Sequence, residues 1–322
     1  MKRDKVSRRE FLERSAIASA AAAALPSLVS TPAEAAAGQI PHRTLGRTGA
    51  SVSILAMGCG SRFLMYSADE ASGVLEKALA LGINYFDTAV NYGDGESETR
   101  VGRVMATRRK DVFLATKIPT HARTRDAALR EVEASLRRLQ TDHVNLLHLH
   151  SLGKDEDLAK IEAADGALKA LYELRDQKVA RAIGMTSHTD GPTMAKAIER
   201  NDLDCVQMAM NPARALRFEE MALPAANKKN LGVILMKVTA QEKLLGPGGA
   251  PPGALLRYAW SLPVSTVVCG MPKVEFIEAN VASARAFTPM TPGDLDGLRT
   301  QLAGKQVALE HFFADHVDHG LA

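Results

Sequence analysis

The chain has 322 residues and a formal net charge of +3, and part of that charge falls in its first residues. No basic stripe with interleaved aromatic residues follows, so we expect no nucleic-acid partner. The three cysteines, Cys59, Cys205 and Cys269, lie far apart and form no Cys-x-x-Cys pair. This spacing is typical neither of a disulfide framework nor of a zinc site, and we expect buried free thiols.

Residues 1–35 have the composition of an export signal. The segment Ser7-Arg8-Arg9-Glu10-Phe11-Leu12 matches the twin-arginine motif, an alanine-rich apolar run spans residues 16–29, and Ala33-Glu34-Ala35 offers small residues around a cleavage point. The alternative, an uncleaved membrane anchor, would need an apolar run of about 20 residues, and this run is shorter. We therefore predict a signal peptide over residues 1–35, recognised by the twin-arginine translocase, and a periplasmic location.

Residues 36–322 are predicted to form a single domain, because no linker or low-complexity stretch divides them. The segment His42–Ser53 is typical of a β-hairpin with Thr48-Gly49 at its turn. Eight short apolar runs follow, and helical patterns over residues such as 68–81, 125–139 and 167–177 lie between them. The eight predicted strands are Ile54–Gly58, Ile83–Ala89, Val112–Ile118, Val144–His150, Ala182–Thr186, Cys205–Met210, Val233–Val238 and Thr266–Gly270.

Eight alternations of strand and helix predict an α/β fold, the closed (β/α)8 TIM barrel, for which about 250 residues is typical. The N-terminal β-hairpin would close the bottom of this barrel. Thr291 as a helix cap and Pro292 at the first helical position predict an extra C-terminal helix. The alternative is an open, doubly wound sheet, which would want a Gly-x-Gly-x-x-Gly turn after an early strand, and the sequence has none.

Polar residues stand at the ends of three successive predicted strands. Asp87 and Tyr92 follow the second strand, Lys117 ends the third and His150 ends the fourth. A buried aspartate can simply cap a loop and a tyrosine can be plain core, but active sites of (β/α)8 enzymes lie at these strand ends. We therefore expect the four side chains to meet at the mouth of the barrel.

These four groups suit the reduction of a carbonyl. Hydride addition builds negative charge on the carbonyl oxygen, which a general acid must protonate. A free tyrosine has a pKa of about 10, and a nearby ammonium favours its phenolate form. We expect Tyr92 to be the acid, Lys117 to assist it, Asp87 to orient the lysine, and His150 to hydrogen-bond the substrate oxygen.

The segment Phe86–Gly93, together with Glu96-Ser97-Glu98, resembles the signature of the aldo-keto reductase family. The resemblance extends over nearly all of residues 43–286, with Arg43–Gly49 similar to the opening hairpin and Leu139–Leu146 similar to the segment that enters the fourth strand. It implies a barrel that binds NADPH without a Rossmann domain and reduces a small aldehyde or ketone. It also places Asp87, Tyr92, Lys117 and His150 on the catalytic tetrad.

The resemblance also implies a cofactor site. Thr186 and Ser187 stand where the family holds the nicotinamide carboxamide, Gln207 matches a strand glutamine, and Met210 replaces the stacking tyrosine. Phe276 occupies the place of an arginine that binds the 2′-phosphate in many relatives, and Lys273 could supply that charge. We expect NADP, with NAD as the other possibility. The residues predicted to bind the cofactor are Thr186, Ser187, Gln207, Met210, Lys237, Gly270, Met271, Lys273 and Asn280.

Two alternatives remain beside a reductase. His148 and His150 alternate on one strand and so share a face, as in metal-dependent hydrolases, but His148 should lie one layer deeper as a hydrogen-bonded core residue. We therefore expect no metal there, and we interpret His311, His316 and His319 as a solvated helix and tail. A non-catalytic, nucleotide-binding sensory module is the other alternative, and an intact tetrad favours the enzyme. The sequence predicts no oligomeric state.

Overall fold

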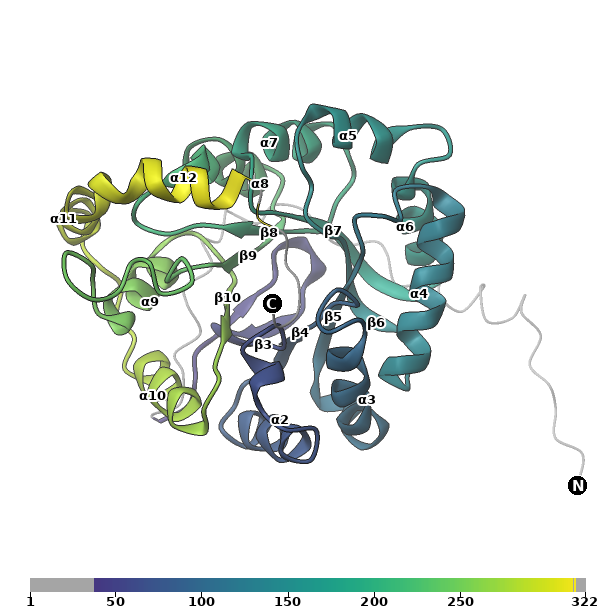
Figure 1. Cartoon of the computed structure of the whole chain (residues 1–322), viewed down its shortest axis with the longest axis horizontal. Helices are drawn as coiled ribbons and strands as arrows, with labels where there is room; N and C mark the ends of the chain where they lie inside the picture. The colour runs from purple at the N-terminus through teal and green to yellow at the C-terminus, as the bar shows by residue number, and fades with distance from the viewer. Residues whose placement is uncertain (1–37, 315, 317–322) are drawn as a thin grey trace, which may run out of the picture. The chain divides into compact units, whose positions relative to one another are not determined.

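The computed structural model describes residues 38–314 and 316, so the predicted signal peptide, residues 1–35, lies outside the described residues, as does His319. Within the described part, parallel strands form a closed barrel in the order β10-β3-β4-β5-β6-β7-β8-β9 (Figure 1). These strands are β3 (Leu55–Gly58), β4 (Tyr85–Asp87), β5 (Phe113–Ile118), β6 (Val144–Leu149), β7 (Ala180–Ser187), β8 (Cys205–Ala209), β9 (Gly232–Met236) and β10 (Thr266–Gly270).

The barrel confirms the predicted (β/α)8 architecture. Each predicted strand is present, with its ends shifted by no more than two residues. The last strand pairs with the first, Val267 with Leu55 and Gly270 with Gly58, so the sheet has no edge at this point. This pairing excludes the open, doubly wound alternative.

Helices surround the barrel on its outer face (Figure 1). They are α2 (Glu70–Ala80), α3 (Glu96–Arg108), α4 (Arg125–Leu139), α5 (Asp155–Glu162), α6 (Ala167–Asp176), α7 (Gly191–Arg200), α8 (Leu223–Lys228), α9 (Pro252–Ser261) and α10 (Val274–Arg285). Short 3-10 helices and one π-helix lie elsewhere in the described residues: η1 (Gly46–Thr48), η2 (Phe63–Met65), η3 (Arg109–Asp111), η4 (Ala215–Arg217), the π-helix η5 (Phe218–Ala222) and η6 (Ala303–Lys305). Within the described residues no helix is long and apolar enough to cross a membrane.

The core has two parts, because strand residues alternate between the helix-facing and the interior side of the barrel. The larger part packs the strands against the helices; in α4, for example, the buried residues Ala128, Val132 and Leu139 recur at helical spacing. The smaller part fills the lower interior of the barrel. It consists of Leu45, Val52, Ala56, Tyr85, Phe113, Ala115, Leu146, Ala182, Cys205 and Ile234.

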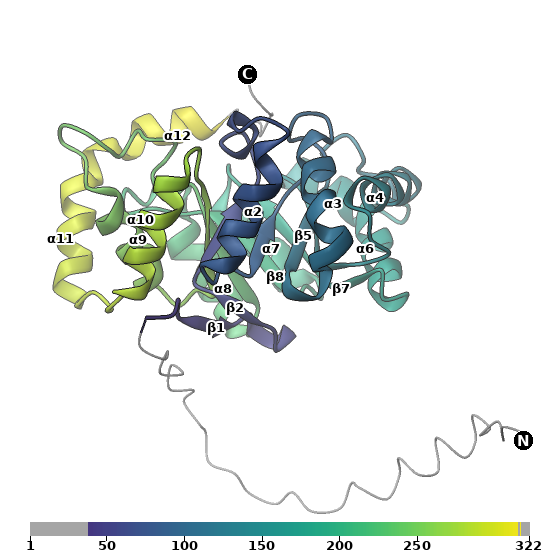
Figure 2. The same ribbon diagram turned by 90° about the horizontal axis from the view of Figure 1, so that it is seen from below.

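The predicted hairpin closes the end of the barrel at which the strands begin (Figure 2). Its strands β1 (His42–Thr44) and β2 (Ser51–Ser53) pair antiparallel, and Gly49 makes the turn with φ 71°. Leu45 is fully buried inside the barrel. Gly46, with φ 47°, lies so close to the chain before β9 that an added Cβ would be 2.2 Å from the Gly232 nitrogen. Only glycine fits there without displacing the hairpin.

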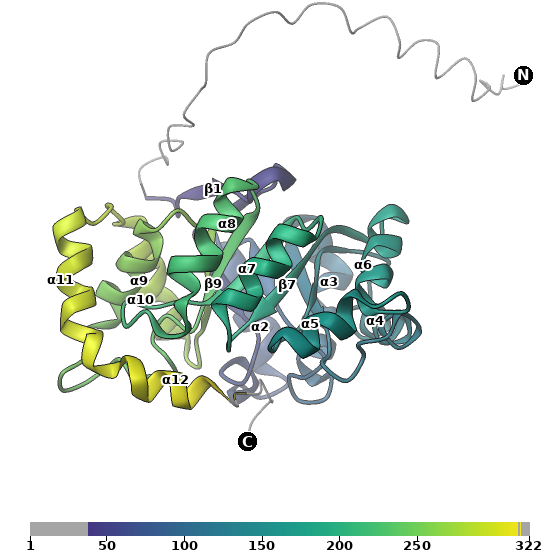
Figure 3. The same ribbon diagram turned by 90° about the horizontal axis from the view of Figure 1, so that it is seen from above.

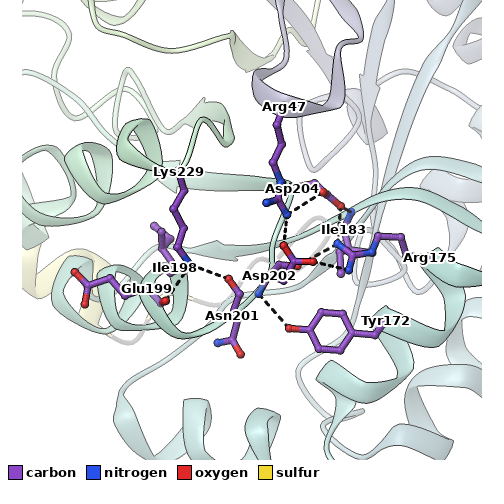
Figure 4. A network of polar contacts seen from close by, with 10 residues as sticks. All are labelled: Arg47, Tyr172, Arg175, Ile183, Ile198, Glu199, Asn201, Asp202, Asp204 and Lys229. Carbon is purple, nitrogen blue, oxygen red and sulfur yellow. Dashed lines mark hydrogen bonds and ion pairs between the residues drawn. The ribbon is translucent and has the colours of Figure 1, made fainter. Parts of the chain in front are cut away.

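A polar network fastens the hairpin at this closed end (Figure 4). Arg47 contacts Asp202 at 2.5 Å and Asp204 at 3.2 Å, and Arg175 of α6 contacts the same two carboxylates at 2.8 and 3.3 Å. Lys229 donates to the last carbonyls of α7, at 2.6 Å to Ile198. These pairs join the hairpin, α6 and the start of β8, and they lie at the end of the barrel away from the predicted site.

The predicted C-terminal helix is confirmed as α11 (Pro292–Leu302). The Thr291 hydroxyl accepts from the Asp294 amide at 3.2 Å, and the Asp294 carboxylate accepts from the Thr291 amide at 3.1 Å, so both halves of a capping box are present. A further helix, α12 (Gln306–Ala314), follows within the described residues. It packs against η4 at the end of the barrel opposite the hairpin (Figure 3).

Candidate active site

The four predicted catalytic residues converge at the carboxyl ends of neighbouring strands. Asp87 is the last residue of β4, Tyr92 lies in the loop that follows, Lys117 lies in β5 and His150 directly follows β6. The Lys117 Nζ donates to Asp87 Oδ1 at 2.6 Å, to the Thr88 carbonyl at 2.9 Å and to the Tyr92 hydroxyl at 3.3 Å. The three donors of the ammonium thus all have acceptors.

His150 completes the group from the next strand. Its ring stands edge-on to the Tyr92 ring, with centroids 5.9 Å apart, and its Nδ1 lies 3.2 Å from the Asn91 Oδ1. Asn91 therefore fixes the orientation of the imidazole. Sequence reasoning missed this contact, although Asn91 directly precedes Tyr92 in the segment that carries the family resemblance.

The chemistry of the group follows from its burial. The side chains of Lys117 and Asp87 are 0% and 2% exposed, so their charges interact in a poorly solvated environment. An ammonium held there stabilises negative charge on the Tyr92 oxygen when that oxygen loses its proton. The arrangement can therefore deliver a proton from Tyr92 to an acceptor at the barrel mouth.

A buried carboxylate next to this group has a structural task. Glu98 of α3 is fully buried, accepts from the Thr116 hydroxyl at 2.6 Å and pairs with Arg138 of α4 at 2.7 Å. Thr116 directly precedes Lys117 in β5. Glu98 thus links α3 and α4 to the strand that carries the lysine, and among the described residues it makes no hydrogen bond with the four predicted catalytic groups.

Cys59 lies beside the group as an inert thiol. It is fully buried, and burial together with the nearby Asp87 charge raises the pKa of the thiol far above its usual value. All three cysteines are free, and Cys59 and Cys205 are buried, as predicted, while Cys269 is partly exposed. A thiol that stays protonated is a poor nucleophile.

His148 lies one layer deeper than His150, inside the barrel, as predicted. It is fully buried in register with Lys117 and Gly184, and burial followed by the nearby Lys117 charge lowers the pKa of its ring well below the usual value. The expectation of a hydrogen-bonded histidine is wrong, because neither ring nitrogen has a partner among the described residues. Gly184 opposite it offers no side chain. Among residues 38–314 and 316, no three His, Cys, Asp or Glu side chains are grouped to hold a metal ion.

The residues predicted to hold the nicotinamide end lie on the next strands. Thr186 and Ser187 end β7, Gln207 lies in β8 and Met210 directly follows it, all of them buried. The two hydroxyls already contact the loop after β6: Thr186 Oγ1 accepts from the Ser151 amide at 2.8 Å, and Ser187 Oγ donates to the Leu152 carbonyl at 2.8 Å.

Gln207 offers the clearest fit to a cofactor amide. Its Nε2 donates to the Met236 sulfur at 3.7 Å, while its buried Oε1 has no hydrogen-bond partner among the described residues. A buried acceptor without a donor is costly, and an amide N–H of a bound nicotinamide would satisfy it. Gln207 therefore offers one acceptor that would fit such an amide.

The residues predicted to approach the phosphates are more dispersed. Lys237 follows β9 with φ 59°, and its Nζ lies 3.0 Å from the His316 Nε2. Gly270 is exposed and lies next to the Arg62 side chain. The Met271 side chain is buried in the core, so only the backbone of Met271 can contact a ligand.

The adenosine end would lie along α10. Lys273 is the exposed N-cap of this helix, and Asn280 stands seven residues later, two turns along the same face. Phe276 is 49% exposed between them. His316, interpreted as part of a solvated tail, instead packs on the buried His188 ring with centroids 5.1 Å apart, so that expectation is wrong.

A closed parallel barrel with an acid, an ammonium, a phenol and an imidazole at its strand ends has the layout of a (β/α)8 enzyme. The family model described as "Aldo/keto reductase family" matches residues 56–252. The chain belongs to the aldo/keto reductase family.

Individual relatives agree with this family. The chain is 32% identical to D-threo-aldose 1-dehydrogenase of a Pseudomonas species over 242 residues, which cover 64% of this chain and 68% of that protein. It is 35% identical to the uncharacterized oxidoreductase YqkF of Bacillus subtilis over 159 residues, which cover 45% of this chain and 48% of YqkF, so this match spans about half the relative's length. The holo form of the aldo-keto reductase AKR11C1 from Bacillus halodurans superposes with a TM-score of 0.69 at 25% identity, over 82% of this chain and 96% of that one.

Proposed function

We propose that this protein is an NAD(P)H-dependent reductase of small aldehydes or ketones in which Tyr92 is the general acid. One observation carries the proposal: the buried Lys117 ammonium contacts the Asp87 carboxylate and the Tyr92 hydroxyl at once. This contact couples a proton donor to a fixed positive charge, and such general acid catalysis typically contributes about 10²–10⁴-fold to a rate.

The bound nicotinamide would supply a hydride to the carbonyl carbon. His150 orients the substrate through a hydrogen bond with the carbonyl oxygen. Tyr92 gives its proton to the same oxygen as negative charge develops there, and Lys117 stabilises the phenolate that remains. Asp87 holds the Lys117 ammonium in place.

For the cofactor, we assign the nicotinamide end to Gln207, Thr186, Ser187 and Met210. The Gln207 Oε1 would accept from the carboxamide, and Met210 would pack on the ring, since a thioether adapts to flat surfaces. The other assigned residues, toward the phosphates and adenosine, are Lys237, Gly270, Met271, Lys273 and Asn280. We favour NADP over NAD because Lys273 is an exposed cation at the start of α10.

Sugars are a reasonable substrate class to test. The similar protein from Pseudomonas is named as a dehydrogenase of D-threo-aldoses, which is the reverse direction of the same carbonyl chemistry. We therefore propose assays in both directions, with aldoses and small aldehydes.

We also propose that the protein is exported by the twin-arginine translocase and works in the periplasm. The Arg8-Arg9 motif and the alanine-rich run support this location. Because this route carries folded proteins, the cofactor would be bound in the cytoplasm before export.

The decisive experiment is to purify residues 36–322 and to follow nucleotide oxidation with a panel of aldehydes, ketones and aldoses. The proposal expects turnover of several carbonyls. The competing view, a nucleotide-binding module without catalysis, expects tight nucleotide binding and no turnover of any panel member.

A further inference from the structure

We propose that Arg123 is a positioning residue for His150. It holds the end of β6 in a strained turn, paired with Asp157, and so sets the place of the imidazole at the site. This inference rests on the proposed function for its kinetic consequence but not for its structural one.

The contacts of Arg123 reach the backbone of the catalytic strand end. Arg123 lies in the loop between β5 and α4 and is only 9% exposed. Its Nη2 donates to the carbonyl oxygen of His150 at 2.8 Å and to that of Ser151 at 3.1 Å. One guanidinium nitrogen therefore contacts two consecutive carbonyls, one of which belongs to His150. Because its other N–H goes to Asp157, the two carbonyls share one N–H.

Two consecutive carbonyls can converge on one donor only where the strand turns, since they point in opposite directions along an extended strand. Ser151 provides the turn with φ 48°, in the left-handed region that is strained for a residue other than glycine. The Ser151 amide is held from the other side by Thr186 Oγ1 at 2.8 Å. Hydrogen bonds from Arg123 on one side and to Thr186 on the other therefore stabilise the strained turn.

Asp157 fixes the arginine in turn. Its carboxylate accepts from Arg123 Nε at 2.9 Å and from Nη2 at 2.8 Å, and it also accepts from the Gly153 amide at 3.0 Å. The pair is largely shielded from water, so its geometry is better defined than that of an exposed ion pair. Asp157 therefore links the arginine, the turn and the first turn of α5.

The first residue of α4, Arg125, offers a control. Arg125 also makes a two-point ion pair, with Glu173 of α6 at 2.8 and 2.6 Å, but among the described residues it makes no contact with β6 or the turn after it. Replacing Arg125 removes a two-point ion pair without releasing His150, although the Arg125 side chain is 35% exposed and that of Arg123 is 9% exposed. A difference in kcat between the two variants therefore reflects the loss of the turn contacts and not the loss of an ion pair in general.

The test compares Arg123→Ala with Arg125→Ala, using 4-nitrobenzaldehyde and NADPH as probes. A displacement of about 1 Å can cost about 10²-fold, so we expect kcat of Arg123→Ala to fall by that order. We expect the KM for the aldehyde and the dissociation constant for NADPH to change less than about threefold, because the substrate and cofactor contacts remain. Added methylguanidinium should restore part of kcat in Arg123→Ala and none in Arg125→Ala.

A kcat of Arg123→Ala no lower than that of Arg125→Ala overturns the proposal, and so does a loss of NADPH binding in proportion to the loss of kcat. If Arg123→Ala does not fold, Arg123→Lys takes its place. A lysine cannot hold two carbonyls and both carboxylate oxygens together, so we expect about a tenfold loss of kcat. A parent-like kcat for Arg123→Lys also overturns the proposal.

A readout without turnover separates this inference from the proposed function. The imidazole signals of His150, assigned by comparison with His150→Gln, should shift in the NMR spectrum of Arg123→Ala and stay in place in Arg125→Ala. If the parent reduces no carbonyl but these signals shift, the reductase fails and the positioning role stands. If the parent is an active reductase and the signals of both variants match the parent, the positioning role fails alone.

Discussion

The Lys117 ammonium lies 3.3 Å from the Tyr92 phenol oxygen, although the two residues come from different strand ends. In this contact the lysine donates and the tyrosine oxygen accepts. The phenol proton is therefore directed to another acceptor, and a carbonyl oxygen at the barrel mouth is the acceptor that the proposed reaction requires.

Replacing Tyr92 by Phe removes this proton and keeps the ring. We expect carbonyl reduction to fall by about 10²–10⁴-fold, the range for general acid catalysis. Nucleotide binding, measured by quenching of protein fluorescence, should change little. Reductase activity within a few-fold of the parent would exclude Tyr92 as the acid.

Replacing Lys273 by Ala should weaken NADPH selectively. A hydrogen bond to a charged group contributes about 1.5–3 kcal/mol, and each 1.4 kcal/mol is about a tenfold change, so we expect roughly ten- to a hundredfold weaker NADPH binding. NADH lacks the 2′-phosphate and should bind nearly as before. Lys110→Ala, an exposed lysine of η3, is the matched control. An equal loss of affinity for NADPH and NADH would mean that Lys273 only stabilises the local backbone. If the parent protein binds NADH more tightly than NADPH, Lys273 does not bind the 2′-phosphate.

His148 should make stability depend on pH. Its pKa is well below the usual value in the folded protein, so below pH about 6.5 the unfolded chain binds a proton that the native state does not. Stability is therefore lost as the pH falls from about 6.5 toward the folded pKa, at about 1.4 kcal/mol per pH unit.

Urea unfolding at pH 7.5 and 5.5 measures this loss. The variant His148→Gln should lose less stability than the parent between these conditions, by about 1.4 kcal/mol. His311→Gln, on the exposed face of α12, should keep the parent's difference. The same pH difference in His148→Gln and in the parent would show that His148 is not the group responsible.

Gly46→Ala should destabilise the barrel without altering the chemistry. The added Cβ would collide with backbone next to Gly232 at a positive φ, and we expect a loss of at least about 2 kcal/mol in the free energy of unfolding, with kcat unchanged. Gly297 of α11 is the control, because an added Cβ there meets nothing. Gly297→Ala should gain about 0.5–1 kcal/mol, as alanine does in a helix. A Gly46→Ala protein as stable as the parent would show that the hairpin can move aside.

Arg8→Lys together with Arg9→Lys should block export and leave activity intact, because a receptor reads the signal. Fractionation of cells that express each form measures the effect, and the parent serves as control. Normal amounts of cleaved, exported double variant would contradict the twin-arginine signal.

The strands and the convergence of the four predicted catalytic residues could be predicted because local patterns encode them. An apolar run followed by a polar residue marks a strand end, and Asp87, Lys117 and His150 each stand at such a point. The sequence could not show that His148 lacks a hydrogen-bond partner among the described residues, because Gly184 comes to lie opposite it only through the register of β6 and β7. The hydrogen bonds from Arg123 to the carbonyls of His150 and Ser151 could not be predicted either, because no local sequence pattern indicates them. The C-terminal segment was predicted as a helix with a solvated extension, whereas the structure has two helices, α11 and α12, joined by η6.

The closed end of the barrel has a consequence for synthesis. The hairpin leaves the ribosome early, but Arg47 pairs with Asp202 and Asp204, more than 150 residues later, and Gly46 packs on the chain beside Gly232. Contacts of such sequence separation form slowly, because a long loop must close first. In a nascent chain the hairpin therefore cannot take its final position until β9 has been synthesised. The N-terminal end of the barrel closes only after seven of its eight strands have left the ribosome.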